Sequence, residues 1–122
     1  MVPEPGVAIL GAGRVGSALV RLLARGGVEI VVWWTRSAAR ARAASARGRS
    51  CQDGPLPEAL GRATAVIVAL ADQAVPSMAV ELARPGRMAA GAVVFHCGGA
   101  IPAAEALAGL AGTGHPRGTF HP

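Results

Sequence analysis

Several residue types are scarce or missing in this 122-residue chain, and what is missing excludes whole classes of protein. Lysine, asparagine and tyrosine are absent, so all 12 basic residues are arginine. The two cysteines, Cys51 and Cys97, are too few and too far apart for a zinc cluster or a disulfide framework. No apolar run approaches the roughly 20 residues that a membrane-spanning helix needs, and no signal peptide opens the chain. We therefore expect reduced thiols, no metal site, no membrane partner and a cytoplasmic location.

Aromatic residues make up only 3% of the chain, which bears on its net charge of +5. Nucleic-acid-binding proteins cluster basic residues with aromatic ones, whereas the arginines here are scattered over the sequence. We therefore expect no nucleic-acid partner, and a cofactor that bears several phosphates explains the positive charge equally well. The bias toward alanine and arginine indicates a GC-rich coding sequence and hence a bacterial origin.

The chain is organised around residues 7–25, where an apolar strand runs into a glycine-rich turn and an amphipathic helix. In the pattern G-x-G-x-x-G, Gly11 permits the tight turn, Gly13 lets the backbone approach a pyrophosphate, and Gly16 lets the helix pack closely on the sheet. The anion would lie on free N–H groups at the positive end of the helix. Glycine is abundant in this sequence, so a purely structural βα turn is the alternative interpretation.

A second strand is predicted over residues 28–34, and the residues after it bear on the choice between NAD and NADP. An acidic residue at this point would accept a hydrogen bond from the ribose 2′-OH of NAD. The chain has Thr35, Arg36 and Ser37 instead, which suit a 2′-phosphate and favour NADP. Alternatively, Ser37 only caps the next helix, residues 38–47, while Arg36 is solvated. Arg40 in that helix is a possible second neighbour of the 2′-phosphate.

The rest of the chain continues to alternate strands with helices. We expect a short strand or loop over 50–57, a brief helix starting at Pro57, and strands over 65–71 and 92–96. Further helices are predicted from Asp72 to Leu82 and from Pro102 to Leu110, with another strand beginning at Thr119. The pattern predicts one α/β domain with a doubly wound, mainly parallel sheet and helices on both faces.

The carboxyl ends of the later strands supply the remaining candidate residues. Asp72 is expected to N-cap the following helix, although Leu70, Ala71 and Asp72 also lie where a cofactor crevice would be. Cys97, Gly98 and Gly99 follow the strand that ends at His96, at the same edge. Nothing in the spacing of His96, His115 and His121 matches a metal site, and the catalytic residues stay unknown.

Five segments together resemble a bacterial family of predicted NADP-binding oxidoreductases, in which a Rossmann domain precedes a helical domain of unknown function. The segments are Gly11 to Gly16, Thr35 to Ser37, Ala71 to Val75, His96 to Ala100, and Phe120 to Pro122. The family is similar to pyrroline-5-carboxylate reductase, 6-phosphogluconate dehydrogenase and the deazaflavin-dependent NADP reductases.

The resemblance implies a Rossmann-type fold, the cofactor NADP and a place for each candidate residue. Gly11, Gly13, Arg14 and Val15 would contact the pyrophosphate, and Arg36 with Ser37 the 2′-phosphate. Leu70, Ala71 and Asp72, with His96, Cys97, Gly98 and Gly99, would lie along the nicotinamide half. The family usually has serine where Gly98 stands and proline where Ala71 stands.

Two functions remain open. The first is the NADP(H)-binding domain of an oxidoreductase that transfers a hydride to or from a small carbonyl or imine substrate. The second is a non-catalytic nucleotide-binding sensor or assembly module. We expect residues 1–122 to be the dinucleotide-binding domain alone, without the helical domain of the family, either as a piece of a longer protein or as a stand-alone module. A homo-oligomer or a helical-domain partner is also possible.

Overall fold

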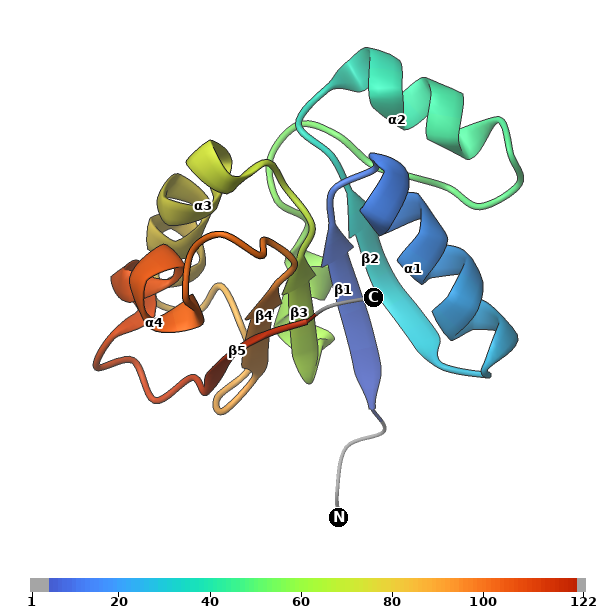
Figure 1. Cartoon of the computed structure of the whole chain (residues 1–122). Helices are drawn as coiled ribbons and strands as arrows, with labels where there is room; N and C mark the ends of the chain where they lie inside the picture. The colour runs from blue at the N-terminus through green and yellow to red at the C-terminus, as the bar shows by residue number, and fades with distance from the viewer. Residues whose placement is uncertain (1–4, 121–122) are drawn as a thin grey trace.

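The computed structural model describes residues 5–120 and consists of a parallel sheet covered by helices (Figure 1). The strands are β1 (Gly6–Leu10), β2 (Glu29–Trp34), β3 (Ala65–Val68), β4 (Val93–His96) and β5 (Arg117–Thr119). The α-helices are α1 (Arg14–Arg25), α2 (Ala38–Ser45), α3 (Val75–Leu82) and α4 (Ala103–Ala106). Three short 3-10 helices complete the fold, namely η1 (Glu58–Arg62), η2 (Asp72–Ala74) and η3 (Ala108–Leu110).

The five strands form one sheet in the order β2-β1-β3-β4-β5, and every neighbouring pair is parallel. The chain leaves β1 toward β2 on one side and returns to place β3 on the other side of β1. The strand order therefore reverses between β1 and β3. In open parallel sheets this switch point, at the carboxyl ends of the strands, is where ligands bind.

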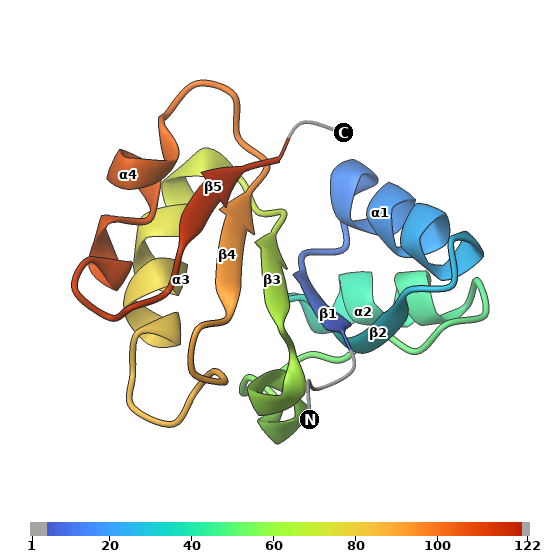
Figure 2. The ribbon, with the colours of Figure 1, turned by 90° about the horizontal axis from the view of Figure 1, so that it is seen from below.

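Strict alternation along the strands sends side chains to two separate cores. Ala8 and Leu10 of β1 face a core built with α3, α4 and the short helices, whereas Ile9 between them faces a core with α1 and α2. The helices accordingly lie on both faces of the sheet, as Figure 2 shows. This arrangement confirms the predicted α/β fold with a doubly wound, parallel sheet.

The segment after α2 pairs with the sheet less than a full strand would. Only Gln52 forms a bridge, parallel to Trp34, while the flanking residues 46–51 and 53–57 make turns and loops. The N–H of Thr35 donates to the carbonyl of Gln52 at 2.8 Å, and the N–H of Gln52 donates to the carbonyl of Trp33 at 2.8 Å. The third strand of the sequence pattern is therefore reduced to a single residue pair.

The expectation that Asp72 caps the following helix is wrong. A turn of 3-10 helix intervenes, so α3 begins at Val75 with Ala74 as its N-cap and Pro76 in the first turn. Neither η2 nor α3 has a side-chain cap bond. The predicted helix over residues 102–110 is likewise divided at Leu107 into α4 and η3.

Among the helices of residues 5–120, none combines the length and the apolarity that crossing a membrane requires.

Candidate functional site

An open pocket of about 630 Å³ lies at the carboxyl ends of the strands, where the strand order reverses. Its walls come from the turn after β1, the turn after β2, and the segments that follow β3 and β4. The lining residues are Gly11, Ala12, Gly13, Arg14, Val15, Thr35, Arg36, Ser37, Arg40, Ala69, Leu70, Ala71, Asp72, Cys97 and Gly98.

The pocket brings together 12 of the 15 residues singled out in the sequence, from four separate segments. Three of those residues do not line it. Gly16 is buried against Gly11 in the turn after β1, His96 is fully buried at the end of β4, and Gly99 is exposed beyond Gly98. Ala12 and Ala69 were not predicted, since an alanine carries no chemical signal beyond its position next to a strand end.

Gly11 is fixed from several sides. Its N–H donates to the carbonyl of Trp34 at 2.6 Å, and its carbonyl accepts a bond of 2.9 Å from the indole N–H of Trp33. Its φ of +130° is one that other residues rarely adopt, and an added Cβ would overlap the carbonyl of Ala69. Glycine is required here because β1, β2 and the end of β3 converge on it.

Gly13 has open space where Gly11 has none. A Cβ at Gly13 would meet only the Arg40 guanidinium, with Nη1 at 3.2 Å, so the backbone faces the pocket directly. Gly13 is the N-cap of α1, no side chain caps this helix, and its first turn holds no acidic residue. The first bond of the helix runs from the N–H of Ser17 to the carbonyl of Gly13, at 3.0 Å. The N–H groups before Ser17 are therefore available to an anion at the positive end of the helix.

Gly16 serves packing. A Cβ at this position would overlap the carbonyl oxygen of Gly11, so only glycine lets α1 approach the turn so closely. The three glycines of the motif thus divide into one turn residue, one residue that faces the pocket, and one packing residue.

The turn after β2 is positively charged. Ser37 caps α2, since its hydroxyl accepts a bond of 3.2 Å from the backbone N–H of Arg40, which confirms the cap that the sequence analysis gave as the alternative interpretation. Arg36 and Arg40 both line the pocket and both are exposed. Among the residues that line the pocket, Asp72 is the only acidic one, and it comes from the opposite wall. A guanidinium pair without a carboxylate beside it suits a phosphate.

The opposite wall explains one departure from the family pattern. A Cβ at Gly98 would overlap the carboxylate oxygen Oδ1 of Asp72. A serine at this position would require Asp72 to move, so the glycine and the position of the carboxylate belong together. The second departure is alanine in place of proline at position 71. The backbone conformation is the same as with proline, since Ala71 has a φ of −59°, within the range to which proline is restricted.

Cys97 and His96 differ in what they offer the pocket. Burial raises the pKa of the Cys97 thiol above its ordinary value of 9.0, so a neutral thiol lines the pocket at physiological pH. His96 accepts a bond of 3.2 Å from the N–H of Gly98 through Nδ1, and its Nε2 lies 3.4 Å from the hydroxyl of Thr119. These bonds hold the turn after β4 against β5.

The other two histidines lie apart from the pocket or outside the described residues. His115 has Nδ1 at 2.8 Å from the carbonyl of Ala92, at the opposite end of β4. His121 falls outside the described residues. Within residues 5–120, no group of three or more His, Cys, Asp and Glu side chains could hold a metal ion.

Solved structures similar to this chain include an oxidoreductase and several dehydrogenases. A predicted NADP oxidoreductase from Bacteroides fragilis is 25% identical, with a TM-score of 0.78 over 98% of this chain and 44% of its own. The 3-hydroxyisobutyrate dehydrogenase of Mycobacterium tuberculosis is 20% identical, with a TM-score of 0.75 over 93% of this chain and 39% of its own. The lactate dehydrogenase of Eimeria maxima, at 13% identity, has a TM-score of 0.65 over 98% of this chain.

This chain spans less than half the length of each of these proteins. No curated protein sequence matches it. The model of the Rossmann-like domain family matches residues 3–122, which is nearly the whole chain. The strand order, the glycine turn and this match agree, and the chain belongs to the Rossmann-like domain family.

Proposed function

We propose that this chain is the NADP(H)-binding domain of an oxidoreductase that transfers a hydride to or from a small carbonyl or imine substrate. The observation that carries the proposal is the shared pocket of the Gly13 turn, Arg36 and the ends of β3 and β4. The likeness to a predicted NADP oxidoreductase at 25% identity supports the same cofactor.

Each wall of the pocket has a part in holding the cofactor. The N–H groups at the start of α1 would bind the pyrophosphate above Gly13. Arg36, Ser37 and Arg40 would bind the 2′-phosphate, and Thr35 would lie beside the ribose. Leu70, Ala71 and Asp72 would face the nicotinamide half, together with Cys97 and Gly98, while the buried His96 would support the turn that carries them. When bound, the nicotinamide supplies the hydride chemistry, and the chain supplies binding and orientation.

The preference for NADPH over NADH tests the proposal. Replacing Arg36 by alanine should remove about 1.5–3 kcal/mol of charge-assisted bonding to the 2′-phosphate. The affinity for NADPH should fall roughly 10- to 150-fold, with little change for NADH. Calorimetric titration of both cofactors measures this. Arg42→Ala is the matched control, because Arg42 is an exposed arginine of α2 that does not line the pocket. Equal affinity of the unaltered chain for NADPH and NADH would rule out the NADP assignment.

A second function rests on how few acid–base groups line the pocket. Apart from arginine, its titratable side chains are Asp72 and Cys97 alone. A domain with this pocket could serve as a nucleotide-binding sensor or assembly module that carries out no reaction. Turnover measurements on the chain separate this alternative from the first proposal.

A further inference from the structure

A second groove lies between α1 and α2, next to the pocket described above, and is lined by arginines. Its volume is about 380 Å³. The lining residues are Ala12, Gly13, Arg14, Ser17, Arg21, Arg40, Ala43, Ala44 and Arg47. The floor consists of small residues, so the four guanidinium groups are the only charged groups that line the groove.

The four arginines form two matched pairs. Arg14 and Arg21 are seven residues apart on α1. Arg40 and Arg47 are also seven residues apart, with Arg40 in α2 and Arg47 in the turn that follows it. Seven residues correspond to two helical turns, or about 10.5 Å, on one face of a helix. Arg14 and Arg40 both line the larger pocket, so they stand at the same end of the groove. On α1, Arg21 therefore stands about 10 Å along the helix from Arg14, and Arg47 lines the groove from the turn that follows α2.

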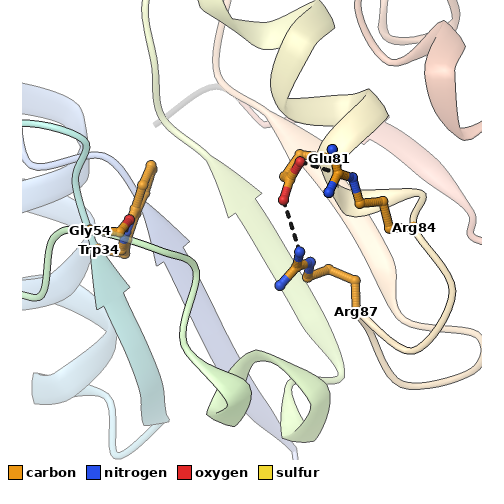
Figure 3. A network of polar contacts seen from close by, with 5 residues as sticks. All are labelled: Trp34, Gly54, Glu81, Arg84 and Arg87. Atoms are coloured by element: carbon orange, nitrogen blue, oxygen red, sulfur yellow. Dashed lines mark hydrogen bonds and ion pairs between the residues drawn. The ribbon is translucent and has the colours of Figure 1, made fainter.

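The positive charge of this half of the molecule is not balanced by carboxylates. Residues 14–49 contain eight arginines and a single acidic residue, Glu29, whereas residues 50–120 contain four arginines and five acidic residues. Glu81 of α3 pairs with Arg84 at 3.1 Å and with Arg87 at 2.8 Å, both on the far side of the sheet (Figure 3). These are the ion pairs found within residues 5–120, and neither includes an arginine of the groove.

The lining of the groove selects among anionic ligands. It contains no aromatic side chain on which bases could stack, which disfavours single-stranded nucleic acid. It also contains no large apolar side chain to receive an amphipathic helix. Guanidinium groups bind phosphate oxygens through paired, charge-assisted hydrogen bonds. We propose that the groove between α1 and α2 binds a small polyanion that carries two or more phosphate groups.

The groove and the larger pocket share Ala12, Gly13, Arg14 and Arg40. The Arg40 guanidinium lies over Gly13, with Nη1 at 3.2 Å from the position of an added Cβ. A polyanion in the groove would therefore use two arginines that also face the pocket, and it should compete with the 2′-phosphate of NADPH. This competition rests on the proposed function, whereas binding to the groove does not.

Inorganic tripolyphosphate is the probe, titrated calorimetrically into the full chain at low ionic strength without any cofactor. The double variant Arg21→Ala/Arg47→Ala should bind it roughly tenfold more weakly, given two exposed charge-assisted contacts. The matched control is Arg25→Ala/Arg42→Ala, which removes the same charge from the same half of the molecule outside the groove and should change the affinity less than twofold. Because all four side chains are exposed, thermal unfolding should confirm that both variants fold. Equal losses in the two variants would overturn the proposal in favour of diffuse charge attraction.

Two further arms identify the ligand and separate the two proposals. Hexaglutamate should bind more weakly than tripolyphosphate. Tighter binding of the peptide would contradict the proposal and indicate that the groove binds an acidic protein segment. Tripolyphosphate should weaken NADPH binding to the unaltered chain and have less effect on the Arg21→Ala/Arg47→Ala variant. If NADPH does not bind at all while tripolyphosphate binds in the groove, the proposed function fails and the present inference stands.

Discussion

At the scale of single residues, the three glycines of the motif differ in whether they could be replaced by a residue with a side chain. Gly11 and Gly16 each face backbone, the carbonyls of Ala69 and Gly11 respectively, whereas Gly13 faces the pocket and the end of one flexible side chain. The G-x-G-x-x-G pattern correctly predicted the tight turn at Gly11 and the close packing at Gly16, whereas the approach of a pyrophosphate to Gly13 stays a prediction. It could not indicate which backbone atoms Gly11 meets, because Ala69 is more than 50 residues away in the sequence.

Gly13→Val should abolish dinucleotide binding while the fold survives. The branched side chain would occupy the space above the turn, where the only atom within 4 Å of its Cβ is Nη1 of Arg40. Circular dichroism and calorimetric titration of NADPH measure the two effects separately. Gly16→Ala is the matched comparison, since its Cβ overlaps the Gly11 carbonyl and should lower the free energy of unfolding by more than about 1 kcal/mol. Unchanged cofactor affinity in Gly13→Val would make the turn purely structural.

The Cys97 thiol should react slowly with iodoacetamide at neutral pH. Because the thiolate is the reactive form and burial raises the pKa of Cys97 above 9.0, the alkylation rate should still be rising with pH beyond that value. The measurement uses a Cys51→Ser variant, so that mass spectrometry reports Cys97 alone. NADPH should slow the reaction, since Cys97 lines the pocket. A rate that levels off below pH 9 would contradict the raised pKa.

At the scale of helices and strands, the sequence predicted the alternation of strands with helices and the covering of both faces of the sheet. Runs such as Val66, Ile67 and Val68 are apolar throughout, as expected for a strand with helices on both sides, and they divide between the two cores. The boundaries were less predictable. The strand expected over residues 65–71 ends at Val68, and after one more backbone bond, from the N–H of Ala69 to the carbonyl of Leu10, the chain turns to line the pocket.

For two segments, the local sequence pattern was not sufficient to predict the secondary structure. Asp72 has the residue type and position of a helix cap, but the 3-10 turn from Asp72 to Ala74 moves the helix start three residues onward. Residues 50–57 contain no apolar run long enough to form a strand, so tertiary context alone decides that Gln52 pairs with Trp34. Neither result can be read from propensity, because each depends on contacts with distant residues.

Ser37→Ala should weaken α2 measurably. The hydroxyl satisfies the N–H of Arg40, and loss of such a cap typically costs about 0.5–2 kcal/mol in the free energy of unfolding. Urea unfolding followed by circular dichroism gives this quantity. Ser37→Gly should cost only a few tenths of a kcal/mol, since glycine is itself a tolerated cap. If alanine and glycine proved equally harmless, the hydrogen bond would contribute nothing to stability.

At the scale of the whole molecule, the chain should bind a dinucleotide and yet not turn over substrate. Hydride transfer to a carbonyl or imine also needs a positioned proton donor, and the wall at the ends of β3 and β4 offers only Asp72 and a neutral Cys97. The test is NADPH oxidation by this chain with a panel of small carbonyl and imine substrates, followed at the nicotinamide absorbance. Steady turnover that Asp72→Asn abolishes would place a complete active site within these residues.

The way in which Gly11 is held has a consequence for the thermodynamics of binding. Its N–H donates to Trp34 and its carbonyl accepts from Trp33, while Ala69 and Gly16 lie so close that an added Cβ on Gly11 or on Gly16 would overlap backbone. The donors at the start of α1 are thus preorganised for an anion before any ligand arrives. Binding of an anion would therefore cost little conformational entropy of the backbone at this wall of the pocket. If the pyrophosphate binds at this wall as proposed, more of its interaction energy with the chain would appear as affinity.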